Sequence, residues 1–243
     1  MSLLPPEDAS VAKFRPNVRR GGSERVFAPG LRRVAIVSHT GSLYGAGRSL
    51  LELVGSLRSM DLGVGVALPR SGMLESELRS LQCQTWRAPL PSWVRNRDGQ
   101  STSQQTLEEF APAAGRLCEE IRGWGPDLVW TNSSITPVGA MAAKALGVPH
   151  VWHLRELNGR EYPNEFCVHV AEVAELIGAA DLRVAVSQAV KEFYEHLGFG
   201  LCERLYNGRL HWCQQLQGEE RHQQCSKSEG ESTHDVSLWM PRE

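Results

Sequence analysis

Between residues 33 and 200, short apolar runs alternate with segments whose apolar residues recur at helical spacing, and this alternation strongly constrains the fold. Mostly apolar strand candidates occur at residues 34–37, 64–68, 128–130, 151–152 and 182–186, and a weaker one lies near residues 85–87. Strands that alternate with helices of ordinary length are typical of a parallel sheet covered by helices. The pattern therefore predicts an α/β fold in which helices flank a mostly parallel sheet.

Helical spacing follows almost every one of these runs. Apolar residues recur every three or four positions in residues 50–57, 74–81, 107–121, 137–146, 166–177 and 187–197. The segment at 107–121 keeps one apolar stripe over four turns, and Gly123 follows it as a stop signal. Residues 89–104 carry Pro, Gly, Ser and Gln without a period and predict a loop.

The extent of this alternating pattern divides the chain into three parts. Residues 1–32 form a basic leader, residues 33–208 a single Rossmann-like domain, and residues 209–243 a polar tail without an apolar period, which we expect to be disordered. The whole chain has 28 acidic against 26 basic residues, so its charge gives no reason to expect nucleic acid as a partner. Residues 1–33 alone have an excess of basic residues, which fits either a solvated leader or a peripheral contact with an anionic membrane.

The six cysteines are widely spread and include no Cys-x-x-Cys pair, as expected of free thiols in a reducing compartment. No run of 18 uncharged apolar residues occurs, so we expect a cytoplasmic protein that touches the inner face of a membrane at most. In the tail, His211, Cys213, His222 and Cys225 have a spacing that fits none of the usual zinc sites. We therefore expect no metal and no resident cofactor.

Ligands of an open parallel sheet collect at the carboxyl ends of its strands, so the residues after each apolar run are the candidates for a site. The first run leads into a glycine-rich loop with Gly45 and Gly47, followed by a helix. Glycines and a helix N-terminus suit a phosphate group. The loop lacks the third glycine of a dinucleotide fingerprint and the lysine of a P-loop, so a simple tight turn is an equal alternative.

Two further strand ends carry polar groups. Asn132 and Ser133 follow the run at 128–130, where Ser133 or its neighbour Ser134 could also cap the next helix. His153, Arg155 and Glu156 follow the run at 151–152 and form the densest ionisable cluster at any strand end. A structural histidine and a catalytic one are both compatible with this pattern.

Taken together, these segments resemble the N-terminal half of a family-4 glycosyltransferase, built from two facing Rossmann-like domains in the GT-B fold. The segments that resemble it are VAIVSHTGSLYGAGRSLLELV, PDLVWTNSSITPVGAMAAKALGVPHVWHLRE, ADLRVAVSQAVKEFYEHLGF and ERLYNGRL, in the family's order between about residues 33 and 210. In that family the N-terminal domain chiefly holds the acceptor, the C-terminal domain grips the nucleotide-sugar, and transfer retains the anomeric configuration. The resemblance implies a hexosyltransferase type of enzyme that uses a nucleotide-sugar and a glycan or lipid-linked acceptor.

The resemblance also implies roles for single residues. His153 matches the catalytic strand-end histidine near the reacting sugar, and Gly45 and Gly47 match the first-loop glycines near the donor phosphates. Asn132 and Ser133 match positions on the acceptor side, where we also place Glu156. Arg155 either assists the donor phosphates or pairs with Glu156.

The chain departs from the family after Tyr206-Asn207-Gly208, which matches the interdomain linker. Only 35 residues follow, and they do not resemble the donor-binding domain. We therefore expect a truncated acceptor-side domain that is inactive alone or that completes its site with a partner chain carrying the donor domain. The alternative is a non-catalytic module that binds a glycan or a phosphorylated metabolite.

Overall fold

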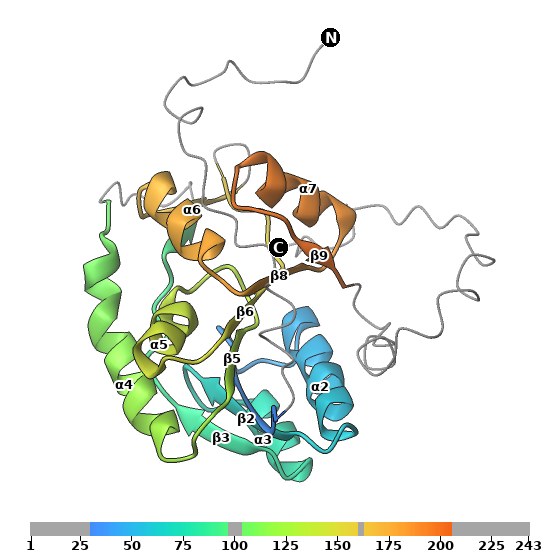
Figure 1. The fold of residues 1–243 in the computed structure, drawn as a ribbon. Helices are drawn as coiled ribbons and strands as arrows, with labels where there is room; N and C mark the ends of the chain where they lie inside the picture. Colours follow the sequence, from blue (N-terminus) through green and yellow to red (C-terminus); the bar gives the residue numbers. More distant parts are fainter. Residues whose placement is uncertain (1–29, 97–103, 160–162, 206–243) are drawn as a thin grey trace, which may run out of the picture. The chain divides into compact units, whose positions relative to one another are not determined.

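The computed structural model describes residues 30–96, 104–159 and 163–205, and within them seven strands form one sheet in the order β3-β2-β1-β5-β6-β8-β9 (Figure 1). Every neighbouring pair in this sheet is parallel. The strands are β1 (Arg33–Val37), β2 (Gly63–Leu68), β3 (Gln84–Arg87), β5 (Leu128–Thr131), β6 (His150–Leu154), β8 (Leu182–Ala185) and β9 (Glu203–Arg204). The α/β, Rossmann-like fold with a mostly parallel sheet is confirmed.

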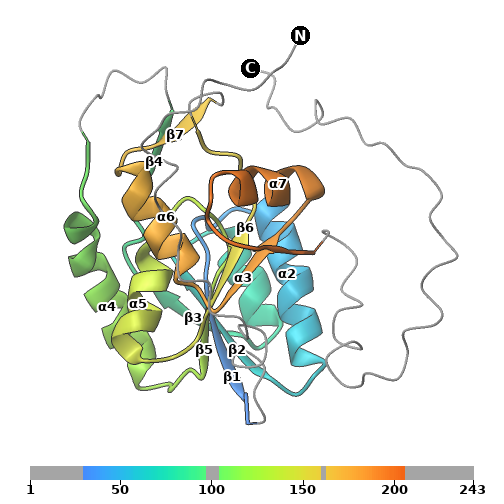
Figure 2. The same cartoon turned by 45° about the horizontal axis from the view of Figure 1, so that its top comes forward.

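Helices cover both faces of the sheet, with α2 and α3 on one face and α4 and α5 on the other (Figure 2). The helices are α2 (Gly45–Arg58), α3 (Met73–Ser80), α4 (Ala111–Arg122), α5 (Val138–Leu146), α6 (Val170–Gly178) and α7 (Gln188–His196), with a 3-10 turn at Leu107–Phe110 before α4. None of these described helices is long and apolar enough to cross a membrane.

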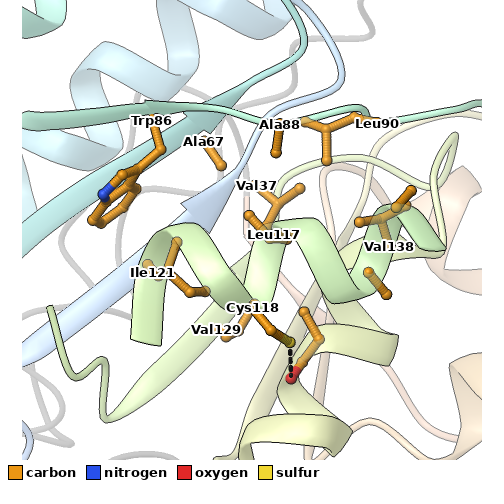
Figure 3. Packing of buried hydrophobic residues seen from close by; sticks show 14 of the residues in the cluster. Val37, Ala67, Trp86, Ala88, Leu90, Leu117, Cys118, Ile121, Val129 and Val138 are labelled. Atoms are coloured by element: carbon orange, nitrogen blue, oxygen red, sulfur yellow. Dashed lines mark hydrogen bonds between the residues drawn. The ribbon is translucent and has the colours of Figure 1, made fainter. Parts of the chain in front are cut away.

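The core between α4, α5 and the sheet is built from the apolar stripe of α4 (Figure 3). Leu117 and Ile121 of α4 are fully buried beside Val129 of β5 and Trp86 of β3. Burying each large aliphatic side chain contributes about 1.5–3 kcal/mol to folding. Trp86 also fills the space above Gly65, because a Cβ at that position would lie inside the indole ring.

One predicted loop contains a strand, and one predicted helix begins too early. Within the segment 89–104, β4 (Val94–Asn96) pairs antiparallel with β7 (Asn164–Phe166) in a separate two-stranded sheet. Phe166 therefore does not belong to a helix; α6 begins at Val170, after the N-cap His169, whose side chain accepts from the Ala171 N–H. Phe166 instead packs its ring edge against Trp93, with the ring centroids 5.5 Å apart.

Several predictions fall on residues outside the described ranges. Most of the basic leader, the polar tail, the linker tripeptide and the four tail residues considered for zinc belong to this group. The three-part division of the chain and the expected disorder of the tail therefore stay predictions.

Candidate functional site

The carboxyl ends of β1, β5 and β6 lie side by side, because these strands are neighbours in the sheet. The register pairs Val37 with Thr131 and Thr131 with Trp152, so the next residues, Ser38, Asn132 and His153, form one row. Residues paired across parallel strands point to the same face of a sheet. β6 runs on to Leu154, so His153 is part of the strand rather than of the loop after it.

Asn132 and His153 are buried without satisfying their polar atoms. Asn132 is 1% exposed and His153 4% exposed. Neither the amide of Asn132 nor either ring nitrogen of His153 has a hydrogen-bond partner among the described residues. Buried polar groups are normally paired, because an unpaired one costs about 1–3 kcal/mol. Such a pair is therefore available to bind a ligand group or ordered water.

His153 is held as a neutral imidazole. Burial lowers the pKa of His153 well below its usual range, and the nearby positive charge of Arg155 lowers the pKa further. The ring stands edge-on to Trp130, with the centroids 5.9 Å apart. A neutral imidazole offers one donor and one acceptor, which suits hydroxyl groups.

The first loop delivers the N-terminus of α2 to this edge of the sheet. Tyr44 is the N-cap, and its side chain makes no capping hydrogen bond, so the first N–H groups of the helix, beginning at Gly45, lack a side-chain partner there. Gly47 is required for a different reason: a Cβ there would lie against the Ser42 carbonyl oxygen, well inside 3.0 Å. Its own N–H donates to the Tyr44 carbonyl (2.7 Å). The structure confirms a tight turn at Gly47. Contact of Gly45 or Gly47 with a phosphate group stays a prediction.

Arg155 links the end of β6 to α2. Its Nη2 donates to the Ser49 hydroxyl (2.5 Å), which lies in the first turns of that helix. Burial lowers the pKa of Arg155, and the neighbouring Glu156 carboxylate opposes this effect. The guanidinium thus lies where α2 begins and also interacts electrostatically with Glu156, so both roles considered for Arg155 stay open.

Ser133 and Glu156 are hydrogen-bonded to each other. The Ser133 hydroxyl donates to Glu156 Oε1 (2.9 Å), and Ser134 donates to Oε2 through its N–H (2.8 Å) and its hydroxyl (2.7 Å). Asn158 Nδ2 donates to the Ser134 hydroxyl (2.9 Å), and the Tyr194 hydroxyl donates to the Glu156 carbonyl (3.0 Å). This network ties the turn after β5 to the segment after β6. Of the three residues placed on the acceptor side, Asn132 alone has an uncommitted side chain within the described network.

The sequence did not single out His39, which the structure places at the same edge. The residue follows β1 and is half-buried. Burial lowers the pKa of His39, Glu156 acts to raise it and Arg155 acts to lower it further. Its place two residues after a strand that leads into a glycine-rich turn is the only sequence signal that could have pointed to it.

His150, the first residue of β6, is structural. Its Nε2 is hydrogen-bonded to the Thr131 hydroxyl (2.8 Å), on the sheet face opposite to His153. Burial lowers the pKa of His150 to about 3. This histidine is neutral at pH 7 and has a protein partner, unlike His153.

Comparison with known proteins identifies the family of the chain. A model of the family described as the glycosyl transferase 4-like domain matches residues 44–205, more than half of the chain. The chain belongs to this family. No curated protein matches the chain.

Solved structures with the same fold include HepE of Anabaena. Its complex with UDP and glucose gives a TM-score of 0.54 at 19% identity, covering 73% of this chain and 45% of HepE. Its complex with UDP-glucose gives 0.54 at 20% identity, covering 73% and 44%. At these identities the likeness shows the fold alone. The chain spans less than half the length of HepE.

Proposed function

We propose that this domain is the acceptor side of a retaining glycosyltransferase of hexosyltransferase type, which moves a sugar from a nucleotide-sugar to a glycan or a lipid-linked acceptor. The observation that carries this proposal is the pair Asn132 and His153, buried with unpaired polar atoms side by side at the carboxyl ends of β5 and β6. The titles of the HepE structures name UDP, glucose and UDP-glucose as ligands of that protein, which supports a nucleotide-sugar donor.

The proposed roles follow from the charge that develops in the reaction. Departure of a nucleoside diphosphate builds negative charge on phosphate oxygens, which N–H groups and cations stabilise. The N-terminus of α2 at Gly45 supplies N–H groups, and the guanidinium of Arg155 supplies a cation, near the same strand ends. The neutral imidazole of His153 would hydrogen-bond a sugar hydroxyl, and the Asn132 amide would orient the acceptor. This scheme requires no metal or resident cofactor.

Transfer is proposed to need a donor-binding domain in addition to this one. HepE is more than twice as long as the part of it that this chain matches. A nucleotide-sugar held only at the phosphate end would lack the contacts that orient its anomeric carbon, and orientation accounts for much of the rate of such reactions. The 243-residue chain by itself is therefore proposed to be inactive.

The cellular placement is part of the same proposal. The four cysteines within the described residues, Cys83, Cys118, Cys167 and Cys202, are unpaired thiols. Unpaired thiols of this kind are maintained in reducing compartments. We propose a cytoplasmic enzyme, with a membrane contact only where a lipid-linked acceptor is presented.

A donor screen combined with a binding measurement tests the proposal. The purified chain is incubated with radiolabelled UDP-, GDP- and ADP-sugars, and sugar release is compared with that from heat-denatured chain. We expect no turnover, but weak binding of nucleotide-sugars or oligosaccharides that shifts the NMR signals of Asn132 and His153. Robust turnover would refute the inactivity, and unshifted signals with every ligand would refute the acceptor-side role.

A further inference from the structure

Two histidines at the candidate site differ in access. His153 is closed: both ring nitrogens are enclosed and lack a hydrogen-bond partner among the described residues. In His39, Nδ1 is enclosed without a partner, whereas Nε2 is not among the enclosed atoms. Nε2 of His39 is therefore accessible at the edge of the sheet, whereas a ligand group that bonds to His153 must enter its enclosed surroundings.

His39 lies among the groups that favour an anion. It is the second residue after β1, and the loop that contains it continues into the N-terminus of α2, which the Tyr44 side chain does not cap. The charges that act on His39 within the described residues are Arg155 and Glu156, both from the segment after β6. Arg155 in turn is bonded to Ser49 of α2. His39 thus lies on the loop that leads into the N-terminus of α2, and the Arg155 guanidinium acts on it electrostatically.

We propose that His39 is a further ligand-contacting residue of this site, whose Nε2 donates a hydrogen bond to a phosphate oxygen of the nucleoside diphosphate. This inference rests on the proposed function and adds to it a residue that the family resemblance did not assign. The imidazole carries its proton on Nε2 when the phosphate is bound, and the negative charge of Glu156 favours a second proton on Nδ1. Glu156 therefore supports the charged form of His39 without contacting the ligand.

A hydrogen bond from His39 to a phosphate predicts a ligand-induced change in the pKa of His39, which a structural histidine would not show. In the free chain, burial keeps the pKa of His39 lowered. An anion within about 4–6 Å stabilises the imidazolium and raises the pKa by about 1 unit or more. The closed imidazole of His153 should titrate with no comparable shift, because it lies deeper in the sheet.

The test is an NMR titration of the full 243-residue chain labelled at the histidine Cε1 positions. The pKa of His39 is measured without ligand and with UDP, inorganic pyrophosphate or uridine. We expect UDP and pyrophosphate to raise the pKa of His39 by about 1 unit. Uridine, which carries no phosphate, should leave it unchanged.

Three variants complete the experiment. His39→Asn removes the donor at the Nε2 position and should weaken UDP binding about tenfold, as expected for one hydrogen bond to a charged group. His39→Gln places an N–H near that position and should retain part of the affinity. His196→Asn, an exposed histidine at the end of α7, is the matched control and should bind as the wild type does.

The outcomes separate the two proposals. If UDP shifts the signals of Asn132 and the first turn of α2 while the pKa of His39 stays fixed, His39 is not a ligand contact and the proposed function survives. Unchanged UDP affinity in His39→Asn has the same meaning. If UDP and pyrophosphate shift no signal at this edge, both the contact of His39 and the donor-phosphate site are overturned.

Discussion

Replacing Gly47 with alanine should show how tightly the first loop is packed against α2. A Cβ at this position would lie against the Ser42 carbonyl oxygen, well inside the 3.0 Å that real Cβ atoms keep, with the Ser42 carbonyl carbon at 3.1 Å and Leu74 Cδ2 at 3.7 Å. The first two neighbours are backbone, so the loop itself must move. Gly55 lies in the same helix, is exposed and has nothing within 4 Å of a Cβ, which makes it a matched control.

The expected magnitudes have opposite signs. Alanine is favoured over glycine within a helix by about 1 kcal/mol, so Gly55→Ala should stabilise the chain by about that amount. Overpacking typically costs about 1–3 kcal/mol, and because backbone must shift we place Gly47→Ala at the upper end. The same helical gain offsets part of the cost, leaving Gly47→Ala about 2 kcal/mol less stable than the wild type. The two variants should therefore differ by about 3 kcal/mol.

Urea unfolding followed by circular dichroism at 222 nm measures both free energies. At about 2–4 °C per kcal/mol for a chain of this size, the thermal midpoints should differ by about 6–12 °C. Equal stabilisation by the two substitutions would refute the reasoning, because it would show that the loop gives way without cost. The N-terminus of α2 would then not be fixed by the contact between Gly47 and Ser42.

Two further predictions concern buried polar groups. Glu156→Gln should lower the free energy of unfolding by about 2–3 kcal/mol, because one amide oxygen replaces a carboxylate that accepts from Ser133 and Ser134. The same substitution should lower the pKa of His39 further, because it removes a negative charge that raises this pKa. Unchanged urea unfolding and an unchanged His39 titration would contradict this. His150 takes up a proton only when unfolded between about pH 6 and pH 4, since its folded pKa is about 3, so stability is kept above this window and lost as the pH falls through it. Over that window the wild type should lose about 1.4 kcal/mol per pH unit more than His150→Gln, and parallel curves for the two proteins would show that the proton is not excluded from the folded state.

The parallel sheet could be predicted because its signals are local. Apolar runs of strand length and helical stripes such as that of α4 are visible in windows of 5 to 15 residues. The position of the candidate site followed from the rule that ligands bind at the carboxyl ends of such strands. For this reason Asn132, His153 and Arg155 could be predicted to lie at one edge of the sheet, although they are up to 23 residues apart.

The missed features depend on contacts between distant segments. β4 and β7 are three residues each and pair Val94 with Phe166, so neither has a pattern of its own. Ser133 and Glu156 were both expected to face the acceptor, and only the folded structure shows that they bond to each other. His39 has no partner in the sequence that marks it, because its neighbours Arg155 and Glu156 arrive from another strand.

The central claim is that the carboxyl edge formed by β1, β5 and β6 binds the ligands of this domain. Amide and side-chain NMR of the 243-residue chain, titrated with UDP-glucose, tests it most directly. We predict that the shifted signals are those of His39, Asn132, His153, Arg155 and the first turn of α2. Shifts confined to β4 and β7, or to the opposite edge of the sheet, would contradict the account.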